Sequence, residues 1–224
     1  ARKIGDRRGE GSALGNMGLA YSNLGEYQQA VKFHQQHLKI AREIGDRREE
    51  GIALGNLGGI YTNMGDFQQA IEFIQQDLEI TQELGDRRGE GNALGNLGLA
   101  YGELGEYQRA IELHQQTIEI AREIGDLKGE GHILGNLGLA YSDLGEYQQA
   151  IDVLQQRLKI AREIGDIRGE SSALGSIGNT CIILGEYERA IEFFQQALVI
   201  NQKIDNRQGE ANTLSSLGTA YSHL

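Results

Sequence analysis

The sequence predicts an all-α protein in which helical hairpins stack into a solenoid. A motif recurs every 40 residues along the whole chain. Apolar residues within each copy are spaced by threes and fours, as on one face of a helix. Glycine-containing turns divide each copy into two helical stretches. Because fixed periods of this length are typical of arrays whose units pack only on their neighbours, we expect a single elongated repeat domain over residues 1–224.

The repeated motif opens with a leucine, carries a glycine four residues later and a tyrosine three residues after that. One copy is the stretch from Leu134 to Ile151, LGNLGLAYSDLGEYQQAI. The leucine column comprises Leu14, Leu54, Leu94, Leu134, Leu174 and Leu214. The glycine column comprises Gly18, Gly58, Gly98, Gly138, Gly178 and Gly218. The tyrosine column comprises Tyr21, Tyr61, Tyr101, Tyr141 and Tyr221, with Cys181 in the fifth copy.

The second copy shows how each hairpin arises. Asp46 is a suitable N-cap, because its carboxylate can accept the free backbone N–H groups of a first helical turn. Gly65 supplies the left-handed turn that ends the first helix, and Gly85 ends the second. We expect first helices (A helices) near 7–24, 47–64, 87–104, 127–144, 167–184 and 207–224. Second helices (B helices) are expected near 26–44, 66–84, 106–124, 146–164 and 186–204. The repeats are then about 7–46, 47–86, 87–126, 127–166, 167–206 and a partial 207–224, and residues 1–6 resemble the end of a preceding helix.

The B helices are apolar on two faces. In the first of them, Val31 and Leu38 lie on one face and Phe33 and Ile40 on the other. A lone hairpin buries one face of each helix, whereas a helix between its own partner and the next repeat buries two. The pattern therefore predicts stacking of successive hairpins.

Glycines inside the A helices require a reason, because each costs about 1 kcal/mol relative to alanine. We expect Gly18 and its copies to allow a close approach of the two helices of a hairpin, with Ala30 packed against Gly18. On this account Gly98→Leu unfolds or distorts repeats three and four. The predicted core of each A helix comprises the columns of Leu14, Met17, Gly18 and Tyr21.

Composition and charge exclude several classes of function. The formal net charge is −11 and both signs are mixed along every repeat, so no basic face for nucleic acid is present. No apolar run approaches the roughly 20 residues that span a bilayer, and we expect no membrane partner. A single cysteine fits a reducing compartment, so we expect a cytoplasmic protein whose targeting segments would lie outside this sequence.

The residues of this sequence give little indication of a catalytic, metal-binding or nucleotide-binding site. Cys181 occupies an apolar column, which indicates a buried side chain rather than a nucleophile. His34 also lies in a core column, and the five histidines do not pair with Cys, Asp or Glu at a metal-binding spacing. The glycines around Glu10 do not form a nucleotide-binding fingerprint, because no strand precedes them. We therefore predict a protein without catalytic residues, metal or cofactor. Arg7 and Arg8 and their copies are expected to form exposed ion pairs of small energy.

The columns of the motif resemble the tetratricopeptide repeat (TPR) family, whose pattern has W-x2-L-G-x2-Y-x8-A-x3-F. In the third copy the corresponding residues are Leu94-x2-Leu97-Gly98-x2-Tyr101-x8-Ala110-x3-His114. The usual tryptophan is leucine here, the terminal proline is missing, and the period is 40 rather than 34. This longer repeat resembles those of Pins/LGN-type spindle-orientation scaffolds and of tandem arrays in bacterial, notably cyanobacterial, proteins. The resemblance implies a right-handed superhelix, with A helices lining a concave groove that binds protein or peptide.

The candidate binding residues form the stripe of helix A opposite to its core. The most informative column is a row of mid-helix asparagines, whose amides both donate and accept hydrogen bonds. This binding stripe comprises Ser12, Asn92 and His132 in one column, Asn16, Asn56, Asn96, Asn136 and Ser176 in the next, Leu19, Leu99, Leu139 and Asn179 in the third, and Ser22 and Ser142 at its end. Because it carries small polar residues and leucines rather than a cationic clamp, we expect an uncharged or amphipathic peptide.

Three alternatives remain open from the sequence. The asparagine row either binds the backbone of an extended peptide or bridges neighbouring A helices. Ile182 and Ile183, which replace polar residues in repeat five, mark either a specific apolar contact or neutral drift. The array as a whole either binds a protein partner or is a structural spacer that self-associates head to tail through its open ends.

Overall fold

The computed structural model describes residues 6–224, which contain eleven α-helices and no strand. The predicted all-α class is therefore confirmed for this range. The helices are α1 (Arg7–Asn23), α2 (Tyr27–Ile44), α3 (Arg47–Asn63), α4 (Phe67–Glu83), α5 (Arg87–Glu103), α6 (Tyr107–Glu123), α7 (Leu127–Leu144), α8 (Tyr147–Ile164), α9 (Ile167–Ile183), α10 (Tyr187–Lys203) and α11 (Arg207–Ser222). Each boundary lies within two residues of its prediction. The expected end of a preceding helix at residues 1–6 lies outside the described residues except for Asp6, the N-cap of α1.

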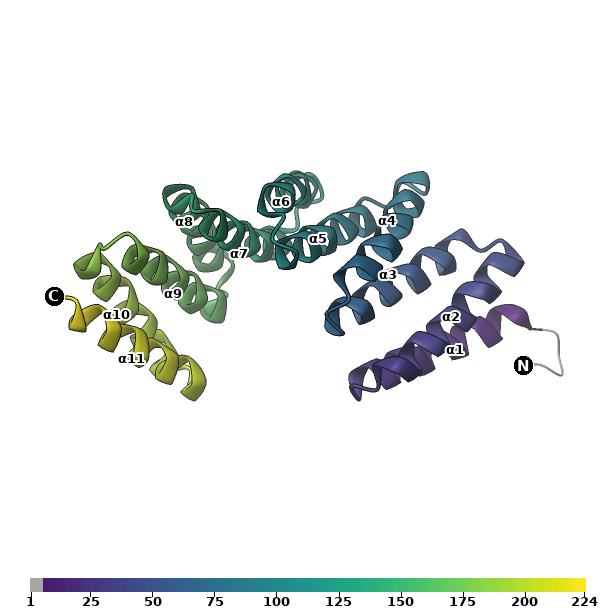
Figure 1. Cartoon of the computed structure of the whole chain (residues 1–224), viewed down its shortest axis with the longest axis horizontal. Coiled ribbons are helices and arrows are strands. Elements are labelled where there is room, and N and C mark those ends of the chain that lie inside the picture. The colour runs from purple at the N-terminus through teal and green to yellow at the C-terminus, as the bar shows by residue number, and fades with distance from the viewer. Residues whose placement is uncertain (1–5) are drawn as a thin grey trace. The chain divides into compact units, whose positions relative to one another are not determined.

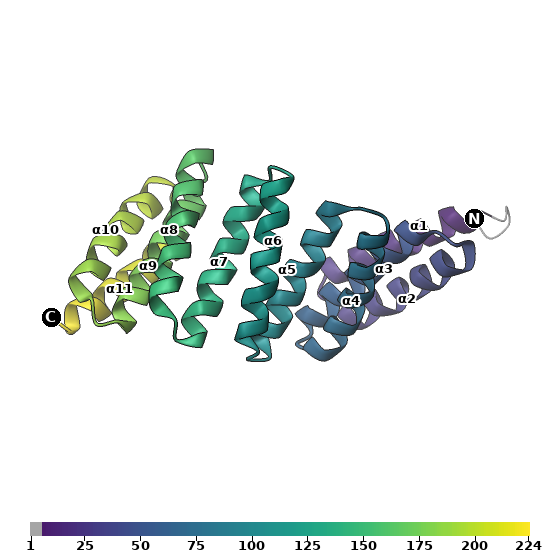
Figure 2. The same ribbon diagram turned by 90° about the horizontal axis from the view of Figure 1, so that it is seen from above.

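The chain forms two compact units, residues 1–113 and 114–224, and their boundary lies inside α6. In the first unit, α1 packs on α2 and α3 packs on α4 as hairpins, while α2 also contacts α3 and α4 also contacts α5. In the second unit, the hairpins α7–α8 and α9–α10 follow the same order, and α11 packs on α10. Figures 1 and 2 show the paired antiparallel helices within each unit. The prediction that each B helix lies between two A helices is confirmed for α2, α4, α8 and α10.

Short polar caps and left-handed glycines set the helix ends. The Asp46 carboxylate accepts the backbone N–H of Glu49 at 3.3 Å, as predicted, and Asp126 accepts that of Gly129 at 2.8 Å. Gly45 lies between α2 and α3 with φ of 68°, a conformation that a residue without Cβ adopts at low cost. Asp205 takes the same place before α11 with φ of 53°. The turn before α11 is therefore the one described turn of this kind without glycine.

The core of each unit lies between its helices. In the first unit it contains Leu54 and Leu57 of α3, both fully buried. In the second unit Phe194, Leu174 and Cys181 pack together, so the prediction of a buried cysteine is confirmed. Burial raises the pKa of the Cys181 thiol to about 11, which keeps it protonated and unreactive at neutral pH.

Two expectations about packing need correction. The side chain nearest to Gly18 is that of His34, since a Cβ at position 18 would lie 2.5 Å from His34 Cδ2, although at the equivalent Gly58 the carbonyl oxygen of Ala70, the counterpart of Ala30, would also lie within 3.4 Å of a Cβ. One turn of helix separates Ala30 from His34, and the longer side chain is the one that reaches across. Met17 was predicted in the core but is 44% exposed, because no described hairpin packs on that side of α1. The equivalent Leu57 has a hairpin on both sides and is fully buried.

The expected ion pairs of the first helical turns are present. Arg8 donates to Asp46 at 2.6 Å, and Arg7 pairs with Glu10 and Glu43. Pairs such as Arg42 to Glu50, at 2.7 Å, join successive repeats. Within residues 6–224, no helix is long and apolar enough to span a bilayer.

Candidate functional site

The residues of the predicted binding stripe lie on the solvent side of the A helices. Ser12, Asn92 and His132 are exposed. In the asparagine column, Asn16 and Asn96 are exposed, while Asn56, Asn136 and Ser176 are half-buried. The third column, Leu19, Leu99, Leu139 and Asn179, is exposed, and Leu139 is 61% accessible. Ser22 and Ser142 are half-buried.

The asparagine amides are available to a ligand. Among the described residues, no hydrogen-bond partner exists for the side chains of Asn16, Asn56, Asn96 and Asn136. In the part of the chain that the structure describes, the single polar contact between neighbouring A helices on this face joins Ser216 to Asn179 at 3.5 Å, which is long for a hydrogen bond. Within residues 6–224, these four asparagines therefore form no hydrogen bond that bridges neighbouring A helices.

Beside the stripe, the same hollow recurs between consecutive repeats. We call it the inter-repeat pocket: it lies between an A helix, the B helix of the same hairpin and the start of the next A helix. Its floor is the glycine-rich first half of helix A, and one B-helix column points into it. In sequence this pocket column comprises His37, Asp77, Thr117, Arg157 and Ala197, and the hollows that the structure shows lie at His37, Asp77 and Arg157.

In the first hairpin His37 fills the inter-repeat pocket. Its ring lies on Gly15, whose added Cβ would be 3.0 Å from His37 Nδ1. His37 Nε2 lies 2.9 Å from Glu49 Oε2 at the start of α3. The ion pair of Arg8 and Asp46 lies at the pocket mouth, and the space left is only about 10 Å³. This pocket is closed by its own side chains.

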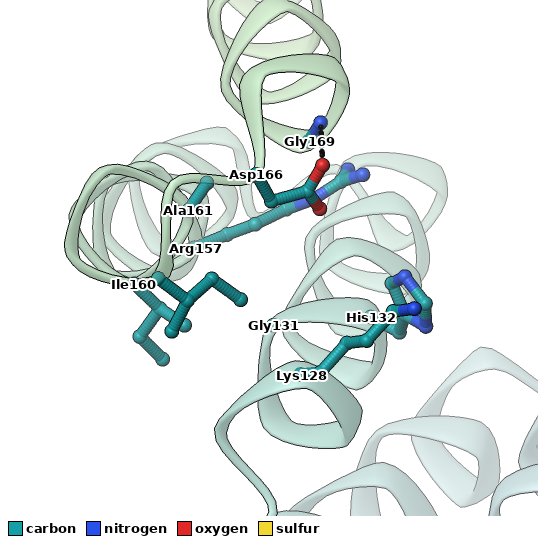
Figure 3. Close-up of a pocket in the computed structure, with 9 residues that line it drawn as sticks. Lys128, Gly131, His132, Arg157, Ile160, Ala161, Asp166 and Gly169 are labelled. Carbon is teal, nitrogen blue, oxygen red and sulfur yellow. Dashed lines mark hydrogen bonds between the residues drawn. The ribbon is translucent and has the colours of Figure 1, made fainter.

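In the fourth hairpin Arg157 fills the corresponding space (Figure 3). An added Cβ at Gly135 would lie 2.7 Å from Arg157 Nη1, so the guanidinium rests on the α7 backbone. Its Nη2 donates to Ser172 Oγ at 3.1 Å. Burial lowers the pKa of Arg157, and the nearby Asp166 carboxylate opposes this shift. Again only about 10 Å³ remains.

The second hairpin is different, because its inter-repeat pocket is open. The hollow measures about 430 Å³. It is lined by Arg48, Gly51, Ile52, Gly55, Asn56, Asp77, Ile80, Thr81, Leu84, Asp86, Gly89, Asn92 and Asn96. Three residues predicted for the binding stripe, Asn56, Asn92 and Asn96, therefore meet in one depression within the first unit.

Asp77 forms the floor of this open pocket. Its Oδ2 would lie 2.8 Å from a Cβ at Gly55 and its Oδ1 3.1 Å from one at Gly51, so the carboxylate lies directly on α3. Within residues 6–224 no donor is hydrogen-bonded to it. Burial, with a smaller contribution from the Asp86 carboxylate, raises the pKa of Asp77 to about 6. A carboxylate held in this way is a favourable partner for a ligand donor.

The pocket column was not among the residues predicted from the sequence to bind a partner. A signal was nevertheless present: the two residues before this position are glutamines in all five copies, whereas the position itself is His, Asp, Thr, Arg or Ala. Among the described residues, no group of three His, Cys, Asp or Glu side chains is arranged to hold a metal ion.

Comparison with known proteins identifies the class of this fold. The tetratricopeptide repeat model matches residues 9–83, 49–123, 89–163 and 169–224. These overlapping segments cover most of the sequence, so the chain belongs to the tetratricopeptide repeat family. The search of curated proteins finds no match.

Solved structures share the architecture at low sequence identity. A Podosopora anserina protein of nearly identical TPR-like repeats, assigned as a kinesin light chain, is 20% identical with a TM-score of 0.76, covering 87% of this chain and 96% of its own. Aspartyl phosphate phosphatase F from Bacillus subtilis is 18% identical with a TM-score of 0.87, covering 99% of this chain and 60% of its own. A Rap protein complexed with competence and sporulation factor is 14% identical with a TM-score of 0.74, covering 95% and 63%. At these identities the similarity shows the fold.

Proposed function

We propose that this chain is a non-catalytic scaffold that binds a segment of another protein along the binding stripe of its A helices. The observation that carries the proposal is the row of exposed or half-buried asparagine amides that have no hydrogen-bond partner among the described residues. The TPR fold supports a role in protein interaction generally, and one structural neighbour is a Rap protein in complex with a factor. The buried free thiol of Cys181 is compatible with the cytoplasmic location expected from the sequence.

The stripe suits an extended, amphipathic segment. An extended backbone leaves its N–H and C=O groups unpaired, and each asparagine amide can satisfy one of each. The exposed leucines Leu19, Leu99 and Leu139 offer apolar contact beside the amides. The polar row would then fix the backbone, while the leucines select apolar side chains.

A display selection with random peptides tests this function. We expect peptides with a shared motif to bind the chain and to be lost on the triple variant Asn56, Asn96, Asn136→Ala. Because these amides have no partner in the described structure, the triple variant should melt within a few degrees of the parent. A matched control removes three exposed B-helix amides, Gln28, Gln68 and Gln108→Ala, and should keep the peptides. If no peptide is enriched and the asparagine variant melts far below the parent, the asparagine row is architectural and the proposal is wrong.

The second candidate is a self-associating array. Leu214 and Tyr221 of α11 occupy columns that are largely buried in interior repeats, yet they are 50% and 55% exposed. Such a free face could stack on α1 of a second copy, head to tail. Light scattering at rising concentration tests this function. A mass that grows with concentration and falls to the monomer on Leu214→Lys supports it, and a constant monomer mass contradicts it.

A further inference from the structure

The open inter-repeat pocket differs from its counterparts in charge as well as in size. In the first hairpin Arg8 pairs with Asp46 across the pocket mouth. At the equivalent place Arg48 lines the open pocket but forms no ion pair with Asp86, whose carboxylate accepts only the Gly89 N–H at 2.9 Å among the described residues. Two carboxylates, those of Asp77 and Asp86, therefore face one hollow without a cation bound to either.

The walls of the pocket are apolar where its floor is acidic. Ile80 is buried, while Ile52 and Leu84 are each about half exposed and border the opening. A lysine or arginine side chain has the same two-part chemistry, because its aliphatic stem packs on apolar surface while its head carries charge. The hollow of about 430 Å³ has room for such a side chain, unlike the closed pockets around His37 and Arg157.

The pocket also opens onto the binding stripe. Asn56 of α3 and Asn96 of α5 both line it. A peptide whose backbone is bound by these amides would pass over Asp77 and could extend one side chain down to the carboxylate. The fourth hairpin supports this geometry, because the chain's own Arg157 occupies the same pocket with its guanidinium on the glycine floor.

We propose that the pocket between α3, α4 and α5 is a cation subsite, in which Asp77 binds the ammonium or guanidinium group of a lysine or arginine of the partner. This inference rests on the proposed peptide-binding function and adds one chemical requirement to it. The amphipathic partner expected from the sequence carries a positive side chain between its backbone contacts to Asn56 and Asn96. Asp86 strengthens the negative field, and Arg48 is the single cation among the residues that line the pocket.

Direct binding of a small probe tests the subsite without a peptide. The whole chain, with 13C-labelled aspartate, is titrated with Nα-acetyl-lysine methylamide, Nα-acetyl-arginine methylamide and the uncharged Nα-acetyl-norleucine methylamide. We expect the two cationic probes to move the Asp77 carboxyl signal and to lower its pKa, and norleucine to do neither. An Asp77 signal that none of the probes moves, or that norleucine moves equally, overturns the subsite. Displacement of the cationic probes by magnesium at matched ionic strength would assign the pocket to a metal ion instead and would also overturn it.

Peptide selection then separates the subsite from the scaffold function. Peptides bound by the parent should share a lysine or arginine at one position and should lose at least tenfold in affinity on Asp77→Asn. Glu79→Gln removes the same charge from an exposed position of the same helix and should change nothing. Peptides that depend on the three asparagines but not on Asp77 would refute the subsite and leave the scaffold function standing. If no peptide binds any variant, the scaffold function fails, and the probe titration alone decides the subsite.

Discussion

Leu154 of α8 closes directly over Gly138 of α7: a Cβ at position 138 would lie 2.7 Å from Leu154 Cγ. Since Cγ is a branch point near the backbone, it cannot move aside as the end of a long side chain can. We expect Gly138→Ala to lower the free energy of unfolding by about 1–3 kcal/mol through overpacking. Urea unfolding followed by circular dichroism measures the change.

Gly175 provides the matched control for this substitution. It also lies inside an A helix, but an added Cβ would meet nothing within 4 Å. Gly175→Ala should therefore stabilise the chain by about 0.5–1 kcal/mol, the helix propensity of alanine over glycine. If both substitutions stabilise, the close approach of α7 and α8 does not explain the glycine column.

Two buried histidines should make stability depend on pH. Burial lowers the pKa of His34 and of His114 to about 4, with a smaller effect of His37 on His34. The unfolded chain then binds more protons than the folded one between pH 4 and 6.5, so stability is complete above 6.5 and falls by up to about 1.4 kcal/mol per pH unit and histidine as pH drops through this window.

Replacement of His34 by Leu, the residue at the equivalent position 154, should flatten this dependence. It should also raise stability at pH 7 by about 1–2 kcal/mol, because neither ring nitrogen of His34 has a partner in the described structure. Melting temperatures of parent and variant from pH 4 to 8 measure both effects. His132→Gln, at an exposed position, is the control. Parallel pH curves for parent and His34→Leu would contradict the assignment.

The contribution of Asp77 to the pH dependence of stability should have the opposite sign to that of the histidines. Its pKa is raised in the folded chain, to about 6 from 3.8, so the folded state binds more protons between these values. Stability therefore falls as pH rises from about 4 to 6 and remains low above that. Asp77→Asn should melt higher than the parent at pH 7 and equally at pH 4. The melting temperature of Glu79→Gln should equal that of the parent at both pH values. A lower melting temperature for Asp77→Asn at pH 7 would show that the carboxylate stabilises the fold.

A buried polar trio replaces small residues between repeats five and six. Asn201 Oδ1 accepts from Ser171 Oγ at 3.0 Å, and its Nδ2 donates to Thr213 Oγ1 at 3.2 Å. Asn201→Ala should cost about 1–3 kcal/mol, because it leaves the buried Ser171 hydroxyl without its acceptor, whereas the Thr213 hydroxyl still donates to Gly209 O at 2.7 Å. The double variant with Ser171→Ala removes the unpaired hydroxyl as well and should recover part of the loss. A double-mutant cycle from urea unfolding measures this coupling, and simple additivity would contradict it.

The helices and their caps could be predicted from the sequence, because both depend on local signals that recur with the 40-residue period. Asp46, Gly45 and Gly65 mark helix ends through backbone chemistry that needs no tertiary context. The identity of packing partners was harder to predict. Whether Ala30 or His34 meets Gly18 depends on how far each side chain reaches between helices, which periodicity does not reveal.

The candidate site could also be predicted only in part. The exposed face of the A helices follows from helical spacing, and Asn56 and Asn96 lie on this face, half-buried and exposed respectively. Asp77 was missed because its column reads as part of a mostly polar B-helix surface. Its significance arises from three-dimensional relationships: the glycine floor at Gly55, the absence of a donor in the described structure, and the open volume beside it.

The glycine floor beneath the pocket column has a consequence for how such an array changes. Because the side chains at His37, Asp77 and Arg157 rest on bare backbone, each can be exchanged without altering the apolar residues that join one hairpin to the next. A gene that lengthens by copying whole 40-residue units could then acquire a new preference by one codon change per copy. For protein engineering, the residues of the pocket column could be exchanged one at a time while the apolar residues between the hairpins stay the same.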